Sequence, residues 1–145
     1  MNPNDALDAL RDVLVADTTL AGYVKAVFLG VRDRISVFPS IVLEPLTIIE
    51  SNESFERNDC RMSVAVIGYL QEMDAEKQIV GDATHTGILT FLNDIKKAIC
   101  ADPTLGGYVI DAVCPESHFE FVNYPIRSVT VGVELLFRQN SKTRV

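Results

Sequence analysis

Tryptophan is absent from this 145-residue chain, and aromatic residues make up only 8% of it. The core must therefore come mainly from Val, Ile, Leu and Ala. No apolar run is long enough to cross a membrane, and residues 1–5 lack the basic and apolar parts of a signal peptide. These absences predict a cytosolic protein that makes no membrane contact.

Cysteine is also scarce. The three cysteines, Cys60, Cys100 and Cys114, form an odd and scattered set, which is not a disulfide framework. We interpret them as small apolar side chains in a reducing compartment.

Basic residues are outnumbered by acidic ones, 13 to 20, and the net charge is −7. A surface that grips duplex DNA needs clustered Lys and Arg, so the composition argues against one. It is compatible with a weakly repulsive surface past which nucleic acid slides. The length predicts one domain over residues 1–145, large enough to bury a core without disulfides or metals.

One nine-residue segment occurs twice, at 16–24 and 101–109, and the copies differ only at their third and sixth positions. Each copy follows a stretch with the apolar spacing of a helix. In each copy the aspartate is a helix N-cap candidate and a glycine is a terminator. The repeat therefore predicts that one structural motif occurs twice: a helix, a tight capped turn and a strand. We expect its leucines (Leu20, Leu105) and tyrosines (Tyr23, Tyr108) to pack.

Helical spacing predicts a first helix from Asn4 or Asp5 to about Val15, and a second that Asp74 caps and that ends near Ile99. Gly81 and Gly87 weaken the first half of this second helix. β-Branched and alternating runs predict strands at 41–49 around Pro45, 62–70, 108–113, 119–122 and 127–138, with a short strand or extended arm at 24–29.

These elements predict an α+β fold: a four- to five-stranded, mostly antiparallel sheet with two main helices packed on one face, in the order α-β-β-α-β-β. Neither face of the 62–70 strand is strongly polar, so we expect it to be central and covered on both sides. Residues 50–59 are charged and predict a loop in which Phe55 is the only large apolar residue. Residues 139–145 predict a polar C-terminal tail.

Motifs that carry chemistry are missing. The chain has no phosphate loop, dinucleotide fingerprint, nucleophile elbow or closely paired cysteines. His85 and His118 lack metal-ligand partners at useful spacing, and the carboxylates of the charged loop lack the EF-hand order. We therefore expect no catalytic residue, no metal and no cofactor. An enzyme remains an alternative, and it would require a concave pocket that holds one of the two histidines.

The strands contain more apolar residues than one buried face needs, among them Ile67, Tyr69, Leu136 and Phe137. Surplus apolar strand surface is typical of a subunit of a ring or barrel. A second layer formed by the segment between Gly22 and Pro39 would explain it equally well. The sequence leaves both interpretations open.

The order of these elements, and the turns that separate them, resemble those of the tail terminator (tail completion) proteins of long-tailed bacteriophages. The resemblance covers nearly the whole chain and has no catalytic motif. The residues that carry it are the helix ending at 16–20, the extended stretch 38–45, the charged loop, the strand 62–70, the long helix ending at 95–99, the turn 102–107 and the strand 127–137.

The resemblance implies a homo-oligomeric ring, typically of six subunits, at the head-proximal end of the tail tube. Such a ring ends tube polymerisation and offers a docking surface to the head connector, while DNA passes through its bore without specific binding. It further implies a virion protein assembled in the bacterial cytoplasm. The alternative is a head-completion or connector (neck) ring protein, because those subunits are also small α+β domains.

Contacts with the tube or with neighbouring subunits are predicted in the charged loop and on the final strand. The loop contributes Glu53, Phe55, Glu56 and Arg57, with Phe55 as the anchor. The final strand contributes Leu136 and Arg138.

Overall fold

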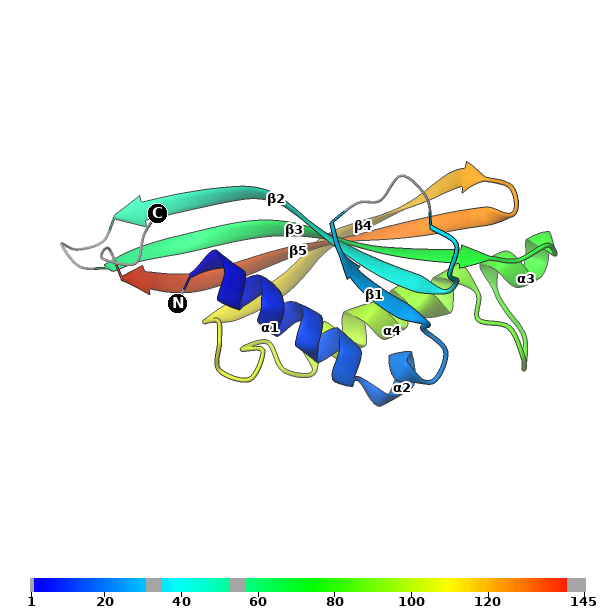
Figure 1. Cartoon of the computed structure of the whole chain (residues 1–145), viewed down its shortest axis with the longest axis horizontal. Helices are drawn as coiled ribbons and strands as arrows, with labels where there is room; N and C mark the ends of the chain where they lie inside the picture. Colours follow the sequence, from blue (N-terminus) through cyan, green and yellow to red (C-terminus); the bar gives the residue numbers. More distant parts are fainter. Residues whose placement is uncertain (1, 31–34, 53–56, 141–145) are drawn as a thin grey trace.

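Helices cover one face of a five-stranded sheet in the computed structural model, which describes residues 2–30, 35–52 and 57–140 (Figure 1). The fold is α+β, as predicted, and the segment at 24–29 supplies a fifth strand. The elements in chain order are α1 (Pro3–Ala16), α2 (Thr18–Ala21), β1 (Ala26–Leu29), β2 (Ser40–Asn52), β3 (Arg57–Gln71), α3 (Ala75–Ile79), α4 (Ile88–Cys100), β4 (Asp111–Asn123) and β5 (Ile126–Asn140).

The strand order is β1-β2-β3-β5-β4, and only the β1–β2 pair is parallel. β3 and β5 pair along their whole length, so they form the centre of the sheet. The strand predicted at 127–138 is confirmed within β5. Those predicted at 108–113 and 119–122 are one strand, β4, with a bulge between Val113 and Glu116.

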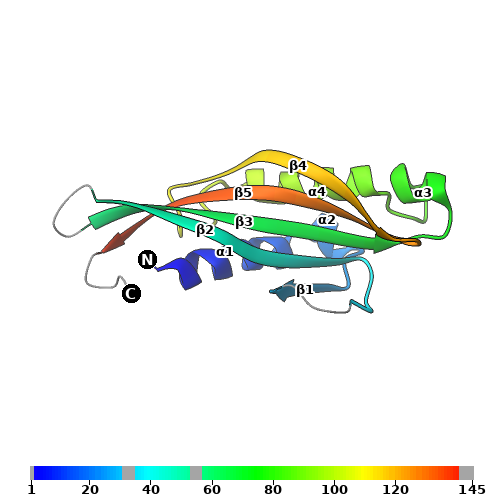
Figure 2. The same ribbon diagram turned by 90° about the horizontal axis from the view of Figure 1, so that it is seen from above.

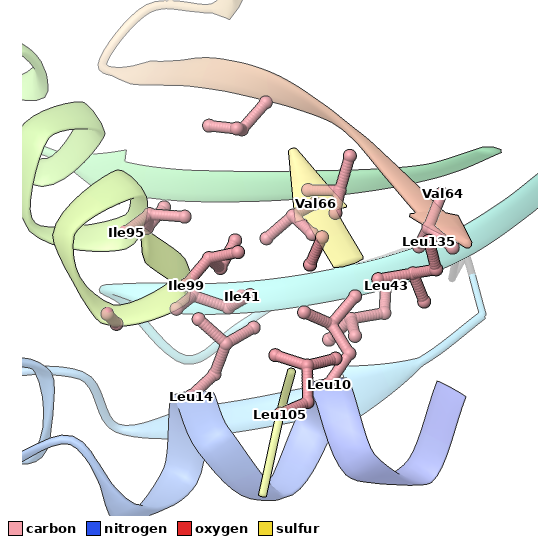
Figure 3. Packing of buried hydrophobic residues seen from close by; sticks show 14 of the residues in the cluster. Leu10, Leu14, Ile41, Leu43, Val64, Val66, Ile95, Ile99, Leu105 and Leu135 are labelled. Atoms are coloured by element: carbon pink, nitrogen blue, oxygen red, sulfur yellow. The ribbon is translucent and has the colours of Figure 1, made fainter. Parts of the chain in front are cut away.

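The core lies between the sheet and helices α1 and α4 (Figure 3). Alternate residues of each central strand point toward the helices, as the period of a strand requires. On β5 the predicted alternation is confirmed, because Val129, Val131, Val133 and Leu135 are buried. Phe137 belongs to the same face and is 1% exposed, so it is part of the core and not of the surplus apolar surface.

No helix in the described part of the chain covers the other face of the sheet (Figures 1 and 2). The expectation that β3 is covered on both sides is therefore wrong. Ser63, Ile67 and Tyr69 are partly exposed there, and the small Ala65 is buried on the same face of β3. Weakly polar side chains on this face are therefore partly exposed and do not indicate a second layer. In the segment between Gly22 and Pro39, β1 joins the sheet edge.

Strand replaces most of the predicted charged loop. β2 continues to Asn52 and β3 begins at Arg57, so only residues 53–56 separate them, and these lie outside the described residues. The predicted C-terminal tail also begins too early. Gln139 is a buried residue of β5 that accepts a hydrogen bond from the Cys60 thiol at 3.3 Å. Residues 141–145 lie outside the described part of the chain. Polar residues misled the prediction because long hairpin strands carry them where no helix covers the sheet.

Glycines split the second predicted helix into α3 and α4. Gly81 has a positive φ of 72°, and a Cβ at this position would lie 2.5 Å from the His85 carbonyl oxygen. The predicted cap at Asp74 is confirmed, since its side chain accepts from the amides of Glu76 and Lys77. The cap of α1 is Asn2, which forms a capping box with Asp5 and replaces the predicted Asn4 or Asp5 cap.

In both repeat copies the aspartate side chain accepts hydrogen bonds from backbone amides, but the two copies differ in backbone conformation. Asp17 accepts from the Leu20 amide at 3.0 Å and caps the single turn of α2, as predicted. Asp102 accepts from the Gly106 amide at 2.7 Å, yet no helix follows. Three left-handed residues replace the helical turn in the second copy, at Leu105, Gly106 and Gly107. β4 consequently begins at Asp111, and not at Tyr108 as predicted.

Candidate partner-binding surface

The predicted contact residues fall into two groups. Glu53, Phe55 and Glu56 lie outside the described residues, and Arg57 is the first residue of β3. Leu136 and Arg138 lie two positions apart on β5, and therefore on the same face of the sheet. That face is the one opposite the helices.

Leu136 lines a shallow hollow of about 360 Å³ together with Ile49, Asp59 and Arg61. Pairing register explains why these residues meet. Ile49 pairs with Arg61 and Arg61 with Leu136, so three adjacent strands contribute one row across the sheet. The Arg138 guanidinium donates to Asp59 at 2.9 Å beside the hollow. The structure thus brings the two predicted β5 residues into one surface. Ile49 and Arg61 are additions that the sequence did not indicate.

β2 forms one edge of the sheet along half of its length. β1 pairs only with residues 40–43, so the outer side of β2 from Glu44 to Asn52 has no partner strand in the described part of the chain. Three apolar side chains are exposed here: Leu46 at 61%, Ile48 at 45% and Ile49 at 66%. The register shift between Pro45 and Thr47 turns this half of the strand. An exposed apolar strand edge is a template for association.

β4 is the opposite edge, and its outer side has no partner strand among the described residues. Val113 and Phe119 are each 43% exposed. Glu116 lies over Gly132 of β5, since a Cβ on that glycine would be 3.7 Å from the Glu116 Cγ. Burial raises the pKa of Tyr69, and the negative charge of Glu120 raises it further, which places Glu120 near Tyr69. This edge is therefore apolar and acidic.

The histidines were the basis of the enzyme alternative. His85 lines a hollow of about 270 Å³, so the pocket that this alternative requires is present. His85 Nδ1 lies 2.9 Å from Asp82 Oδ1, and Nε2 lies 3.5 Å from Glu72. The hydrogen bond from the His85 side chain, together with the Thr84 amide, holds the pKa of Asp82 well below its usual range. These contacts close the 82–85 turn between α3 and α4.

His118 lies on β4 and its side chain is 57% exposed, with Nε2 3.7 Å from Glu120. Within the described ranges, no three His, Cys, Asp or Glu side chains are arranged to hold a metal ion. Among the helices that the structure describes, none has both the length and the apolar character needed to cross a membrane.

The fold that these features define is a mixed five-stranded sheet with a helical layer on one side and, among the described residues, two edges without a partner strand. Neither protein-family models nor curated proteins give a match to this chain. A solved structure does: a chain of the virion of the native gene transfer agent particle, with a TM-score of 0.57 and 11% sequence identity. The match covers 91% of this chain and 93% of that one. At this identity the likeness establishes a common fold.

Proposed function

We propose that this chain is a non-enzymatic structural component of a phage-like virion. The observation that carries the proposal is the shared fold with a chain of the gene transfer agent virion, which spans nearly the full length of both chains. Two open sheet edges with exposed apolar residues support it, because a protein that acts alone rarely leaves such edges uncovered.

Within the virion, we propose a ring at the head-proximal end of the tail tube, where the chain ends tube polymerisation and offers a docking surface to the head connector. The resemblance to tail terminator proteins, which covers nearly the whole chain, supports this position. The net charge of −7 also supports a bore through which DNA passes. An acidic wall offers no Lys or Arg side chains that would bind the DNA phosphates. Ring subunits need two different surfaces, and the two sheet edges supply them.

Electron microscopy of the purified chain, alone and mixed with tail tubes, tests this proposal. We expect closed rings, and we expect one ring at one end of each tube. A chain that stays monomeric at high concentration and also forms no ring on tubes would contradict the proposal. Rings that bind isolated heads but not tubes would favour the head-completion or connector alternative.

A further inference from the structure

The half of β2 that lies beyond β1 presents an apolar surface with an exposed arginine beside it. This β2 surface consists of Ile49 and Arg61, which pair across β2 and β3 on the uncovered face, and of the exposed Leu46 at the bulge before them. Arg61 is exposed, and its guanidinium makes no ion pair with another side chain in the ranges the structure describes. An occupant of this surface must offer apolar side chains and at least one carboxylate.

The outer edge of β4 has that chemistry. This β4 surface consists of Val113, Glu116 and Glu120, which are exposed and lie on the uncovered face of the sheet. Glu120 has only the 3.7 Å contact with His118, itself exposed, and Glu116 has no cationic partner among the described side chains. The β4 surface therefore lacks the positive charge that the β2 surface carries.

The two surfaces lie at opposite edges of one sheet, so they cannot meet within one molecule (Figure 2). We propose that the β2 surface of one copy docks on the β4 surface of a second copy, with Arg61 facing Glu116 and Glu120. Such a contact is head-to-tail, and repetition closes it into a ring if the rotation between copies allows it. The inference rests on the proposed ring and names the surfaces that build it.

Charge complementarity and the prolines at both sheet edges favour a second copy of the chain as the occupant of the β2 surface. The chain itself supplies both halves of a complementary apolar and charged contact. Each edge also carries a proline at a bulge, Pro45 in β2 and Pro115 in β4. Because proline cannot donate to a ladder, it limits continuous strand pairing and favours a contact made by side chains.

Charge reversal followed by mixing tests the pairing. Native mass spectrometry and analytical ultracentrifugation would compare the wild-type chain, Arg61→Glu, and the double variant Glu116→Arg/Glu120→Arg. We expect each variant to self-associate about 100-fold more weakly, because like charges then face each other. An equimolar mixture of the two should regain assembly, with alternating subunits, because opposite charges meet again at every contact.

Arg11→Glu is the matched control, since Arg11 lies on α1, pairs with Asp8 at 3.6 Å and belongs to neither surface. It should assemble like the wild type, and circular dichroism should show that all variants are folded. Unchanged assembly of Arg61→Glu would overturn the inference, as would failure of the mixture to assemble, or a wild-type chain that is monomeric throughout. If Arg61→Glu still forms rings but no longer binds tubes, the β2 surface belongs to the tube contact; the inference then fails while the proposed function stands.

Discussion

Tyr23 and Tyr108 occupy the same position in the two repeat copies but have different environments. The Tyr23 hydroxyl donates to Asp94 of α4 at 2.7 Å, and its ring packs edge-on against Phe91. Burial, followed by the bond to Asp94, raises the pKa of Tyr23 far above its usual range. Tyr108 is 54% exposed, so the expectation that both tyrosines pack is right only for the first copy. The sequence could not separate them, because the difference arises from the left-handed turn at residues 105–107.

Replacing Tyr23 by Phe should lower the free energy of unfolding by about 1.5 kcal/mol, because the change removes a hydrogen bond to a carboxylate and keeps the ring. Tyr108→Phe is the matched control, and it should stay within about 0.5 kcal/mol of the wild type. Urea denaturation at neutral pH measures both. Equal effects of the two substitutions would show that the Tyr23–Asp94 bond does not stabilise the fold.

The three cysteines should differ in reactivity. Burial, and then the neighbouring Cys100 thiol, raises the pKa of Cys114 to about 11. A thiol with this pKa holds roughly 200-fold less thiolate at pH 8 than one with a pKa near 8.5. Cys100 is exposed and Cys60 is buried. We therefore expect iodoacetamide to label Cys100 first, Cys114 slowly and Cys60 only after unfolding, as followed by peptide mass spectrometry. Equal labelling of Cys100 and Cys114 in the folded chain would contradict this assignment.

At the scale of elements, the helices and strands with strong apolar periodicity could be predicted from the sequence, but the ends of the strands could not. The apolar alternation of β5 and the stripe of α4 identified both elements, because each depends on residues close in sequence. The ends of β2 and β3 were missed because polar residues at 50–59 continue as paired strands beyond the helical layer. The pairing register of the strands could not be predicted from the sequence. The sequence therefore did not show that Ile49 and Arg61 lie beside Leu136.

Gly68 sets how closely α4 approaches β3. A Cβ at this position would lie 2.8 Å from Phe91 Cε2, which is closer than van der Waals contact allows. Gly68→Ala should therefore lower the free energy of unfolding by about 1–3 kcal/mol through overpacking. Gly132→Ala on the uncovered face is the control, because its Cβ would meet its nearest atom, the Glu116 carbonyl oxygen, at 3.4 Å. Similar unfolding midpoints for the two variants in urea would contradict this account of helix docking.

At the scale of the whole molecule, the helices and the sheet edges have different roles. The helical face supplies the core, and under the proposed function the uncovered face and the edges serve association. The sequence predicted an assembly protein from its lack of catalytic motifs and its surplus apolar strands. It predicted contacts at Leu136 and Arg138, which lie on the uncovered face, but it did not identify the edges, since the strand order depends on contacts between distant segments.

Tail length is the property that the proposed function controls most directly. Electron micrographs would compare tails from cells that produce every virion protein with tails from cells that lack only this chain. We predict overlong tails of variable length without the chain, and a return to uniform length when it is supplied from a plasmid. Headless tails of normal and uniform length in its absence would contradict a role in ending tube polymerisation.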